Sequence, residues 1–198
     1  MLALIIYLYI GSLSEANERF GNRDEIFDRL LDLLSRHQGL FDVCLIHAHC
    51  TLADGEVMLE NGDVSMPVKI SGTENCYPVS WLPSGEPYEY TTKPTKIPPP
   101  SLFDESRALT RDVEVLGLHY NNCPGMTETR IEWTEGRKNC TRRLTEEDRD
   151  ISAVETQWSL TQEFKKKPKV RCILYCNTTT TRSGAIHLGT QSHHKVSS

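Results

Sequence analysis

Phe41-Asp-Val-Cys-Leu-Ile-His47 is the stretch on which the expected fold depends, because it is apolar almost throughout. A short apolar run of this kind is typical of a buried strand. Ala48-His49-Cys50 follows it directly and brings a second histidine close to the first. We therefore expect a buried strand over residues 41–47, with the other elements arranged around it.

A helix is expected just before this strand. Between residues 24 and 37, the apolar side chains recur at spacings of three and four, with charged residues between them; they are Ile26, Phe27, Leu30, Leu31, Leu33 and Leu34. This period places the apolar side chains on one face of a helix. Gly39 lies just beyond the last of them and is a plausible stop signal. The helix should lay this face on a sheet.

A hairpin is expected after the strand, with strands over 56–60 and 64–68 joined by Asn61-Gly62-Asp63. Pro67 has no backbone N–H to donate, so the second strand should lie at a sheet edge. Residues 77–100 hold seven prolines with interleaved aromatic residues, which favours an extended arm packed across the domain.

The second half of the chain predicts one more helix and several short strands. A helical stripe of apolar residues begins at Ser101 and continues to about Gly117. Candidate strands follow over 129–133, 138–142, 154–159 and 170–176. This order lacks the alternation of strand and helix that builds a parallel sheet. The sequence therefore predicts the α+β class, a mainly antiparallel sheet with about two helices packed on one face.

One domain is expected over residues 21–177. Residues 1–20 form an apolar segment, either a helix or a signal peptide, and 178–198 a flexible C-terminal tail. The first apolar run is too short to span a membrane as a helix, so no membrane span is expected. The 198 residues are 38% hydrophobic and 25% charged, as in ordinary soluble proteins.

Charge and cysteine content narrow the expected partners and compartment. The chain has a net charge of −5, but its last 36 residues carry seven Lys or Arg and one acid. The basic run Lys165–Lys169 lacks interleaved aromatics, so a protein partner is expected rather than a nucleic acid. The seven cysteines form no Cys-x-x-Cys pair. We favour an intracellular protein, and the sequons at Asn139 and Asn177 leave a secreted glycoprotein as an alternative.

His47-Ala-His49 is the one pattern that could carry chemistry. If the strand continues through it, both imidazoles lie on one face and can hold one divalent metal ion, such as zinc, iron or manganese. Glu56 is the predicted third ligand, and four further histidines are available by residue type, namely His119, His187, His193 and His194. The sequence contains no complete catalytic motif, so an enzyme is not the favoured hypothesis.

His47-Ala-His49 followed by Glu56 loosely resembles the first metal motif of the cupins, which bind metal inside a small barrel. Six residues separate His49 from Glu56, where that family has three or four, and Pro83-Ser84-Gly85 is not followed by the second-motif histidine. The expected helices also fit that barrel poorly. The cupin resemblance is therefore kept only as a metal-dependent alternative.

A wider resemblance covers most of residues 24–176. It rests on four stretches: residues 39–49, 91–100, Glu132-Trp-Thr-Glu-Gly136 and Val154-Glu-Thr-Gln-Trp158. In order and spacing they resemble a functionally uncharacterised family of small fungal proteins. The resemblance implies no activity, cofactor or site. The leading hypothesis is thus a non-enzymatic intracellular interaction or structural domain, and the alternative is a metal-binding protein or metal-dependent enzyme.

Overall fold

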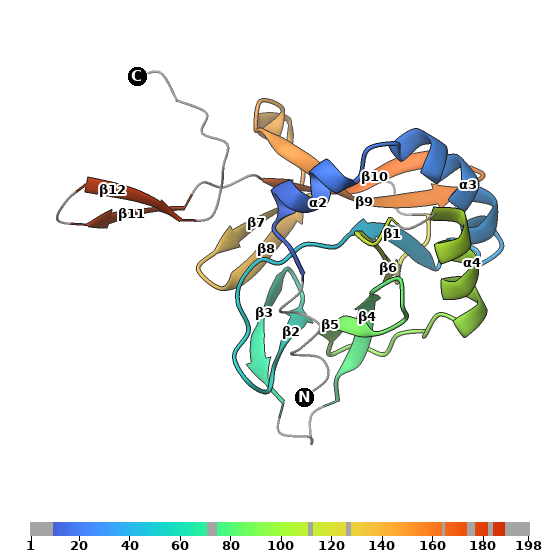
Figure 1. The fold of residues 1–198 in the computed structure, drawn as a ribbon, viewed down its shortest axis with the longest axis horizontal. Helices are drawn as coiled ribbons and strands as arrows, with labels where there is room; N and C mark the ends of the chain where they lie inside the picture. Colours follow the sequence, from blue (N-terminus) through green and yellow to red (C-terminus); the bar gives the residue numbers. More distant parts are fainter. Residues whose placement is uncertain are drawn as a thin grey trace.

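The strands of this chain close into a barrel, as the computed structural model shows (Figure 1). The structure describes residues 10–70, 75–110, 113–125, 128–163, 165–173, 177–181 and 184–188, the last two ranges by their backbone alone. Around the barrel the strands follow the order β1-β6-β4-β5-β2-β3-β8-β7-β10-β9. β1 pairs with both β6 and β9, and this second pairing closes the ring.

The barrel strands are β1 (Phe41–Leu45), β2 (Glu56–Asn61), β3 (Val64–Lys69), β4 (Tyr77–Trp81), β5 (Pro87–Thr91), β6 (Leu116–Tyr120), β7 (Arg130–Glu135), β8 (Lys138–Arg143), β9 (Ala153–Thr161) and β10 (Lys165–Ile173). A short 3-10 helix, η1 (Glu146–Asp148), lies between β8 and β9. β11 (Asn177–Thr181) and β12 (Gly184–Leu188) form a separate hairpin in the region expected to be a tail.

The predicted α+β class, an antiparallel sheet with helices on one face, is wrong. The sheet closes on itself, and it is mixed, because β2 runs parallel to β5 and β7 runs parallel to β10. Closure removes the edge strands that an open sheet would have. Contrary to the prediction from the sequence, Pro67 therefore does not lie on an edge strand, because β3 has a neighbour on each side. Its missing N–H costs no hydrogen bond to β8, since β3 pairs with β8 through Val64 and Ser65.

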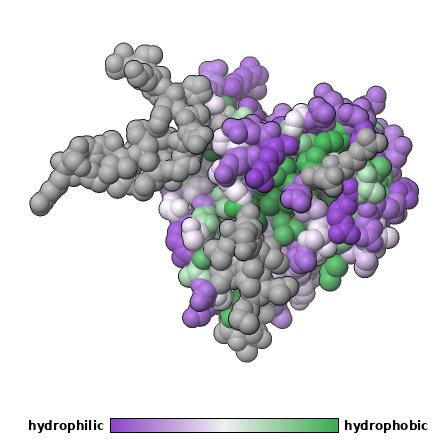
Figure 2. All heavy atoms as spheres, viewed as in Figure 1, coloured by the Kyte–Doolittle hydropathy of each residue, from purple (hydrophilic) through white to green (hydrophobic). Residues whose placement is uncertain are grey.

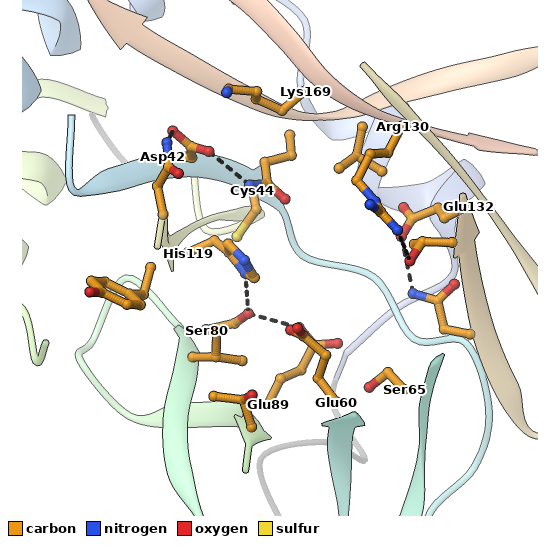
Figure 3. A pocket seen from close by; sticks show the side chains of 18 of the residues that line it. Asp42, Cys44, Glu60, Ser65, Ser80, Glu89, His119, Arg130, Glu132 and Lys169 are labelled. Carbon is orange, nitrogen blue, oxygen red and sulfur yellow. Dashed lines mark hydrogen bonds between the residues drawn. The ribbon is translucent and has the colours of Figure 1, made fainter. Parts of the chain in front are cut away.

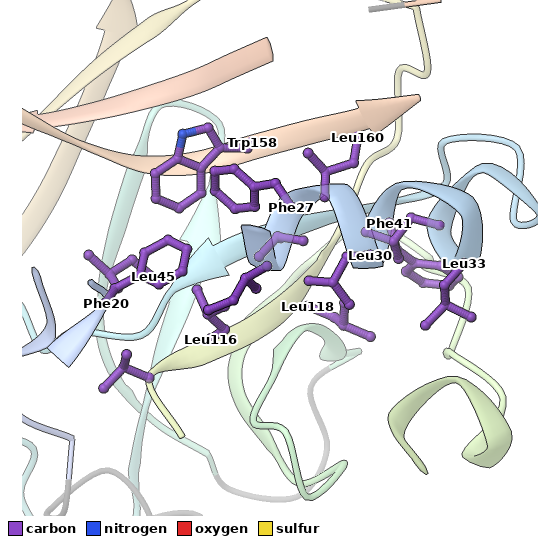
Figure 4. Close-up of a cluster of buried hydrophobic side chains, with 14 of the residues drawn as sticks. Phe20, Phe27, Leu30, Leu33, Phe41, Leu45, Leu116, Leu118, Trp158 and Leu160 are labelled. Carbon is purple, nitrogen blue, oxygen red and sulfur yellow. The ribbon is translucent and has the colours of Figure 1, made fainter. Parts of the chain in front are cut away.

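Three helices cover one side of the barrel from outside: α2 (Leu13–Arg19), α3 (Arg23–Ser35) and α4 (Pro100–Thr110) (Figure 1). α2 begins at Ser12, whose side chain accepts from the Glu15 backbone N–H while the Glu15 carboxylate accepts from Ser12. α3 buries the face that its sequence period indicates. In Figure 4, Phe27, Leu30 and Leu33 of this helix lie against side chains from β1, β6 and β9.

The main hydrophobic core therefore lies between the helices and the outer wall of the barrel. Along β1, Phe41 and Val43 belong to this core, whereas Asp42 and Cys44 line a cavity inside the barrel. This division follows from the alternation of side chains along a strand. The cavity inside the barrel is lined by polar side chains interspersed with apolar ones, and it is here that a functional site has to be sought.

Several predicted elements have other bounds in the structure. The strand predicted over 41–47 ends at Leu45, and the helix predicted to reach Gly117 ends at Thr110, because Leu116 already begins β6. The proline-rich stretch is not an arm across the domain: it supplies β4 and β5 to the barrel. The basic run that begins at Lys165 is the first half of β10 rather than a loop.

The surface on the face shown in Figure 2 is mostly hydrophilic, with hydrophobic residues gathered around the helices. Across the part of the chain that is described, no helix is both long and apolar enough to cross a membrane. Residues 1–9 and 189–198 lie outside the described residues, and with them most of the predicted N-terminal apolar run and the end of the predicted tail.

Candidate metal centre

His47 follows β1, where its side chain is fixed by a local hydrogen bond. Its Nδ1 lies 2.8 Å from the carbonyl oxygen of Leu45. A carbonyl can only accept, so Nδ1 carries the hydrogen and, in the neutral ring, Nε2 carries the lone pair. The residue is only 8% exposed, and among the described residues Nε2 has no hydrogen-bond partner. A buried lone pair without a donor is costly unless something binds it.

His49 lies beside His47, with the ring centroids 4.5 Å apart. Its Nδ1 is 3.1 Å from the hydroxyl oxygen of Thr134 on β7. Burial, together with the neighbouring His47, lowers the pKa of His49 to about 4, although Glu132 opposes the shift. At neutral pH this imidazole is therefore uncharged and can act as a ligand.

Cys172 on β10 completes the group. The three candidate ligand atoms, one each from His47, His49 and Cys172, lie within 4.8 Å of one another. Burial raises the pKa of the Cys172 thiol well above its ordinary value, and the nearby Glu132 carboxylate adds to this effect. A metal ion binds the thiolate, so binding here has to release the thiol proton.

Glu132 stands next to all three side chains. Its carboxylate oxygens lie 3.7 Å from His47 Nε2 and 3.9 Å from His49 Nε2, and the parallel register of β7 and β10 sets it opposite Cys172. Asn139 and Thr156 both donate hydrogen bonds to it, at 3.0 and 2.8 Å. Two donors suit the ionised form. The site thus holds a buried negative charge beside two imidazoles.

These donors match the ligand preferences of zinc. Zinc takes imidazole nitrogen at about 2.0–2.1 Å and thiolate sulfur at about 2.3 Å, in tetrahedral geometry. Donor atoms around such an ion lie about 3.3–3.7 Å apart. The spacing of up to 4.8 Å is therefore about 1 Å wide, and small side-chain rotations would have to draw the donors in.

The structure brings together two of the three predicted ligands. His47 and His49 meet, but the Glu56 carboxylate is engaged elsewhere, with the Arg137 side chain and the Ala53 backbone N–H. Among the other histidines considered, His119 lies on another wall of the cavity, while the His187 side chain and all of His193 and His194 lie outside the described residues.

Sequence reasoning missed Cys172 and Glu132. The even spacing of Cys172 and Cys176 along the last candidate strand indicates one shared face, which is more typical of a core than of a pair of ligands. Cys176 itself lies outside the described residues. The available signal was Glu132 between Ile131 and Trp133, because an acid flanked by apolar residues needs a partner once it is buried.

Two of the three candidate ligands, His47 and His49, line a cavity of about 440 Å³ inside the barrel, and so does Glu132, the register partner of Cys172. Figure 3 shows Glu132 and Arg130 on one side of it and Ser80, Glu89 and His119 on another. Asp42 lines the cavity near β9 and accepts hydrogen bonds from Asn121 and Gln157. Apolar residues such as Val79 and Val170 complete the wall. A volume of this size is within the range that holds a small organic ligand.

Comparison with known proteins gives no match: no family model, no curated protein and no solved structure matches this chain. The fungal and cupin resemblances gain no support from these comparisons, and the site has to be interpreted from its own geometry.

Proposed function

We propose that this chain binds one divalent transition-metal ion, of the zinc class, through His47, His49 and Cys172. Nitrogen and thiolate donors of this kind favour zinc over magnesium or calcium, which prefer oxygen. This proposal develops the metal-binding alternative of the sequence analysis. The expected interaction domain stays a prediction, because no observation in the described residues favours a particular partner.

The observation that carries the proposal is the buried Nε2 of His47, which has no hydrogen-bond partner among the described residues and lies 3.7 Å from the Glu132 carboxylate. Its Nδ1–H donates to the Leu45 carbonyl, which leaves the lone pair of Nε2 directed into a buried polar cluster. Metal-ligating histidines almost always donate their other ring N–H to a carbonyl or carboxylate in this way. A histidine that served packing alone would have no reason to keep a buried acceptor without a donor.

Charge supports the same conclusion. Glu132 is 7% exposed, and the neighbouring His49 is neutral at physiological pH. A buried carboxylate is costly without a counter-charge, and a divalent ion supplies one. Glu132 then either orients the imidazoles or acts as a fourth ligand. Where three protein side chains bind zinc, the remaining position is open to water or a small molecule.

Equilibrium dialysis of the metal-stripped chain against zinc tests the proposal. We expect about one zinc per chain for the wild type, and an affinity at least about 100-fold lower for Cys172→Ser and for His47→Gln. Each of these variants loses a direct ligand, and even partners one step removed from a metal alter affinity by about 10–100-fold.

Two variants serve as matched controls. Cys140→Ser removes another buried cysteine, one that does not belong to the group of candidate ligands, and Glu56→Gln removes the carboxylate predicted from the sequence. Both should bind zinc as the wild type does. Circular dichroism of each variant establishes that it is folded. A folded wild type that takes up no zinc, or a Cys172→Ser variant that binds it equally well, contradicts the proposal.

A further inference from the structure

A row of polar side chains crosses four neighbouring strands on the cavity wall. Asp42 on β1 is the register partner of His119 on β6, and His119 is the partner of Ser80 on β4. Ser80 is in turn the partner of Glu89 on β5. All four residues line the cavity. Such direct cross-strand neighbours are close enough to interact side chain to side chain.

Hydrogen bonds connect three members of this row (Figure 3). The Ser80 hydroxyl lies 2.7 Å from a Glu89 carboxylate oxygen and 2.9 Å from His119 Nδ1. A hydroxyl has one hydrogen to donate. When Glu89 is ionised, Ser80 donates to it, and His119 Nδ1–H must then donate to Ser80. The second ring nitrogen, Nε2, is left as an acceptor.

Protonating Glu89 allows the reverse direction. The carboxyl can donate to Ser80, Ser80 can donate to His119 Nδ1, and Nε2 then carries the hydrogen. Burial raises the pKa of Glu89 to about 7; the Ser80 hydrogen bond opposes this shift, while Glu132 and Glu60 add to it. Both arrangements are thus accessible near neutral pH. His119 Nε2 is an acceptor in one and a donor in the other.

We infer that Glu89, Ser80 and His119 form a proton relay that serves a small ligand bearing a hydroxyl group, bound in the cavity at the proposed metal ion. This inference rests on the proposed function for the position of the ligand. A proton leaves the ligand oxygen for His119 Nε2, the Nδ1 proton passes to Ser80, and the Ser80 proton passes to Glu89. Three bonds to hydrogen break and three form, and the net change is one proton moved from the ligand to Glu89.

The cavity lining favours an uncharged oxygen ligand. Acids outnumber cations around the cavity: six carboxylates line it, namely Asp42, Glu60, Asp63, Glu89, Glu128 and Glu132, against Lys93, Arg130 and Lys169. A carboxylate or phosphate ligand would therefore meet mostly like charge, which costs affinity. A hydroxyl group instead offers the hydrogen bonds that these side chains can make, and its oxygen can bind zinc. The volume of about 440 Å³ suits a small molecule.

Nitrogen NMR of the metal-free chain tests the relay without any ligand. In the wild type at pH 8.5, we expect His119 in the form with hydrogen on Nδ1. In Ser80→Ala at the same pH, the hydroxyl that accepts from Nδ1–H is gone, so this preference for Nδ1 should be lost. His37, which contacts Phe41 outside the cavity, is the internal reference, and its ring should be the same in both proteins.

The relay is overturned if His119 in the wild type carries its hydrogen on Nε2 at pH 8.5. It is equally overturned if His119 in Ser80→Ala keeps the same preference for hydrogen on Nδ1. Neither result depends on zinc. The relay and the proposed metal site can therefore fail separately.

Binding of acetohydroxamate tests the inferred class of ligand. This small neutral compound loses a proton when its oxygens bind zinc. We expect it to bind the zinc-loaded wild type, and to bind His119→Gln and Ser80→Ala at least about tenfold more weakly, the worth of one strong hydrogen bond. Zinc uptake by these variants should equal that of the wild type. Equal acetohydroxamate affinities, or none for the zinc-loaded wild type, contradict the inference while the metal site stands. A wild type without zinc contradicts the proposed function instead.

Discussion

The hydrogen bond between His47 and the Leu45 carbonyl decides which nitrogen of the ring can bind a ligand. A single backbone acceptor two residues away fixes the tautomer, and burial then removes water as a competitor for Nε2. The contrast with Glu56 is instructive. That carboxylate is already satisfied by Arg137 and Ala53, so it has no need of a metal.

Glu89 should make the stability of the protein depend on pH. Its pKa is about 7 in the folded chain, against an ordinary value of 4.5. Between these values the folded state holds a proton that the unfolded state has released, so stability falls as the pH rises from about 4.5 to 7. Glu89→Gln removes this loss. The free energy of unfolding of the variant, minus that of the wild type, should therefore be about 2 kcal/mol larger at pH 8 than at pH 4.5. This figure is smaller than the full pKa difference would give, because the carboxyl faces the cavity and is partly screened there.

Urea unfolding at the two pH values measures this difference. Glu105→Gln is the matched control, because Glu105 is exposed and pairs with Arg36 at the surface. The stability difference between that control and the wild type should be about the same at pH 4.5 and 8. An unaltered pH dependence in Glu89→Gln would mean that the carboxyl ionises normally in the folded protein.

The sequence could predict the paired histidines but not the rest of the cluster. His47 and His49 are neighbours along the chain, so their spacing alone brings them together. Cys172 and Glu132 join them through the parallel register of β7 and β10. That register depends on how far-apart strands pair, and no local pattern encodes it.

Gly117 lies on β6 at a point where the neighbouring strands leave no room for a side chain. A Cβ atom at this position would lie 2.4 Å from the Trp81 carbonyl oxygen and 3.3 Å from the Cys44 sulfur. The Trp81 oxygen belongs to the backbone of β4, which cannot move without disturbing its pairing with β6. Gly117→Ala should therefore destabilise the chain by about 1–3 kcal/mol, the usual cost of overpacking.

Gly21→Ala provides the comparison, since a Cβ at Gly21 would meet nothing within 4 Å. Thermal or urea unfolding of both variants gives the two costs, and that of Gly21→Ala should be small. If Gly117→Ala is as stable as the wild type, β4 and β6 do not lie as close as the structure has them.

Elements with a strong local signal were predicted well, and the others were not. The period of α3 and the turn residues at Asn61-Gly62-Asp63 are local, and both elements are present within a residue or two of their expected bounds. The stripe from Ser101 extended too far because Val113 and Leu116 fit a helical spacing by coincidence, whereas Leu116 is needed by β6. Prolines in β4 and β5 concealed two strands, since proline disfavours a strand interior.

Closure of the barrel reverses the usual relation between a sheet and its core. The helices and the outer wall enclose the main hydrophobic cluster, and most of the acids, histidines and hydroxyl groups of the site face the interior beside a few apolar residues. The alternation Phe41-Asp42-Val43-Cys44 is the same whether β1 lies in an open sheet or in a barrel. A sheet with one solvated face was therefore expected, although the polar face in fact surrounds a cavity.

X-ray absorption at the zinc edge of the loaded wild-type chain tests the central claim most directly. We expect one sulfur at about 2.3 Å and nitrogen or oxygen donors at about 2.0–2.1 Å, with the sulfur absent from any zinc that remains bound to Cys172→Ser. This pattern would establish a site made by imidazoles together with Cys172. A spectrum with no sulfur in the wild type, or with the same sulfur in Cys172→Ser, would contradict it.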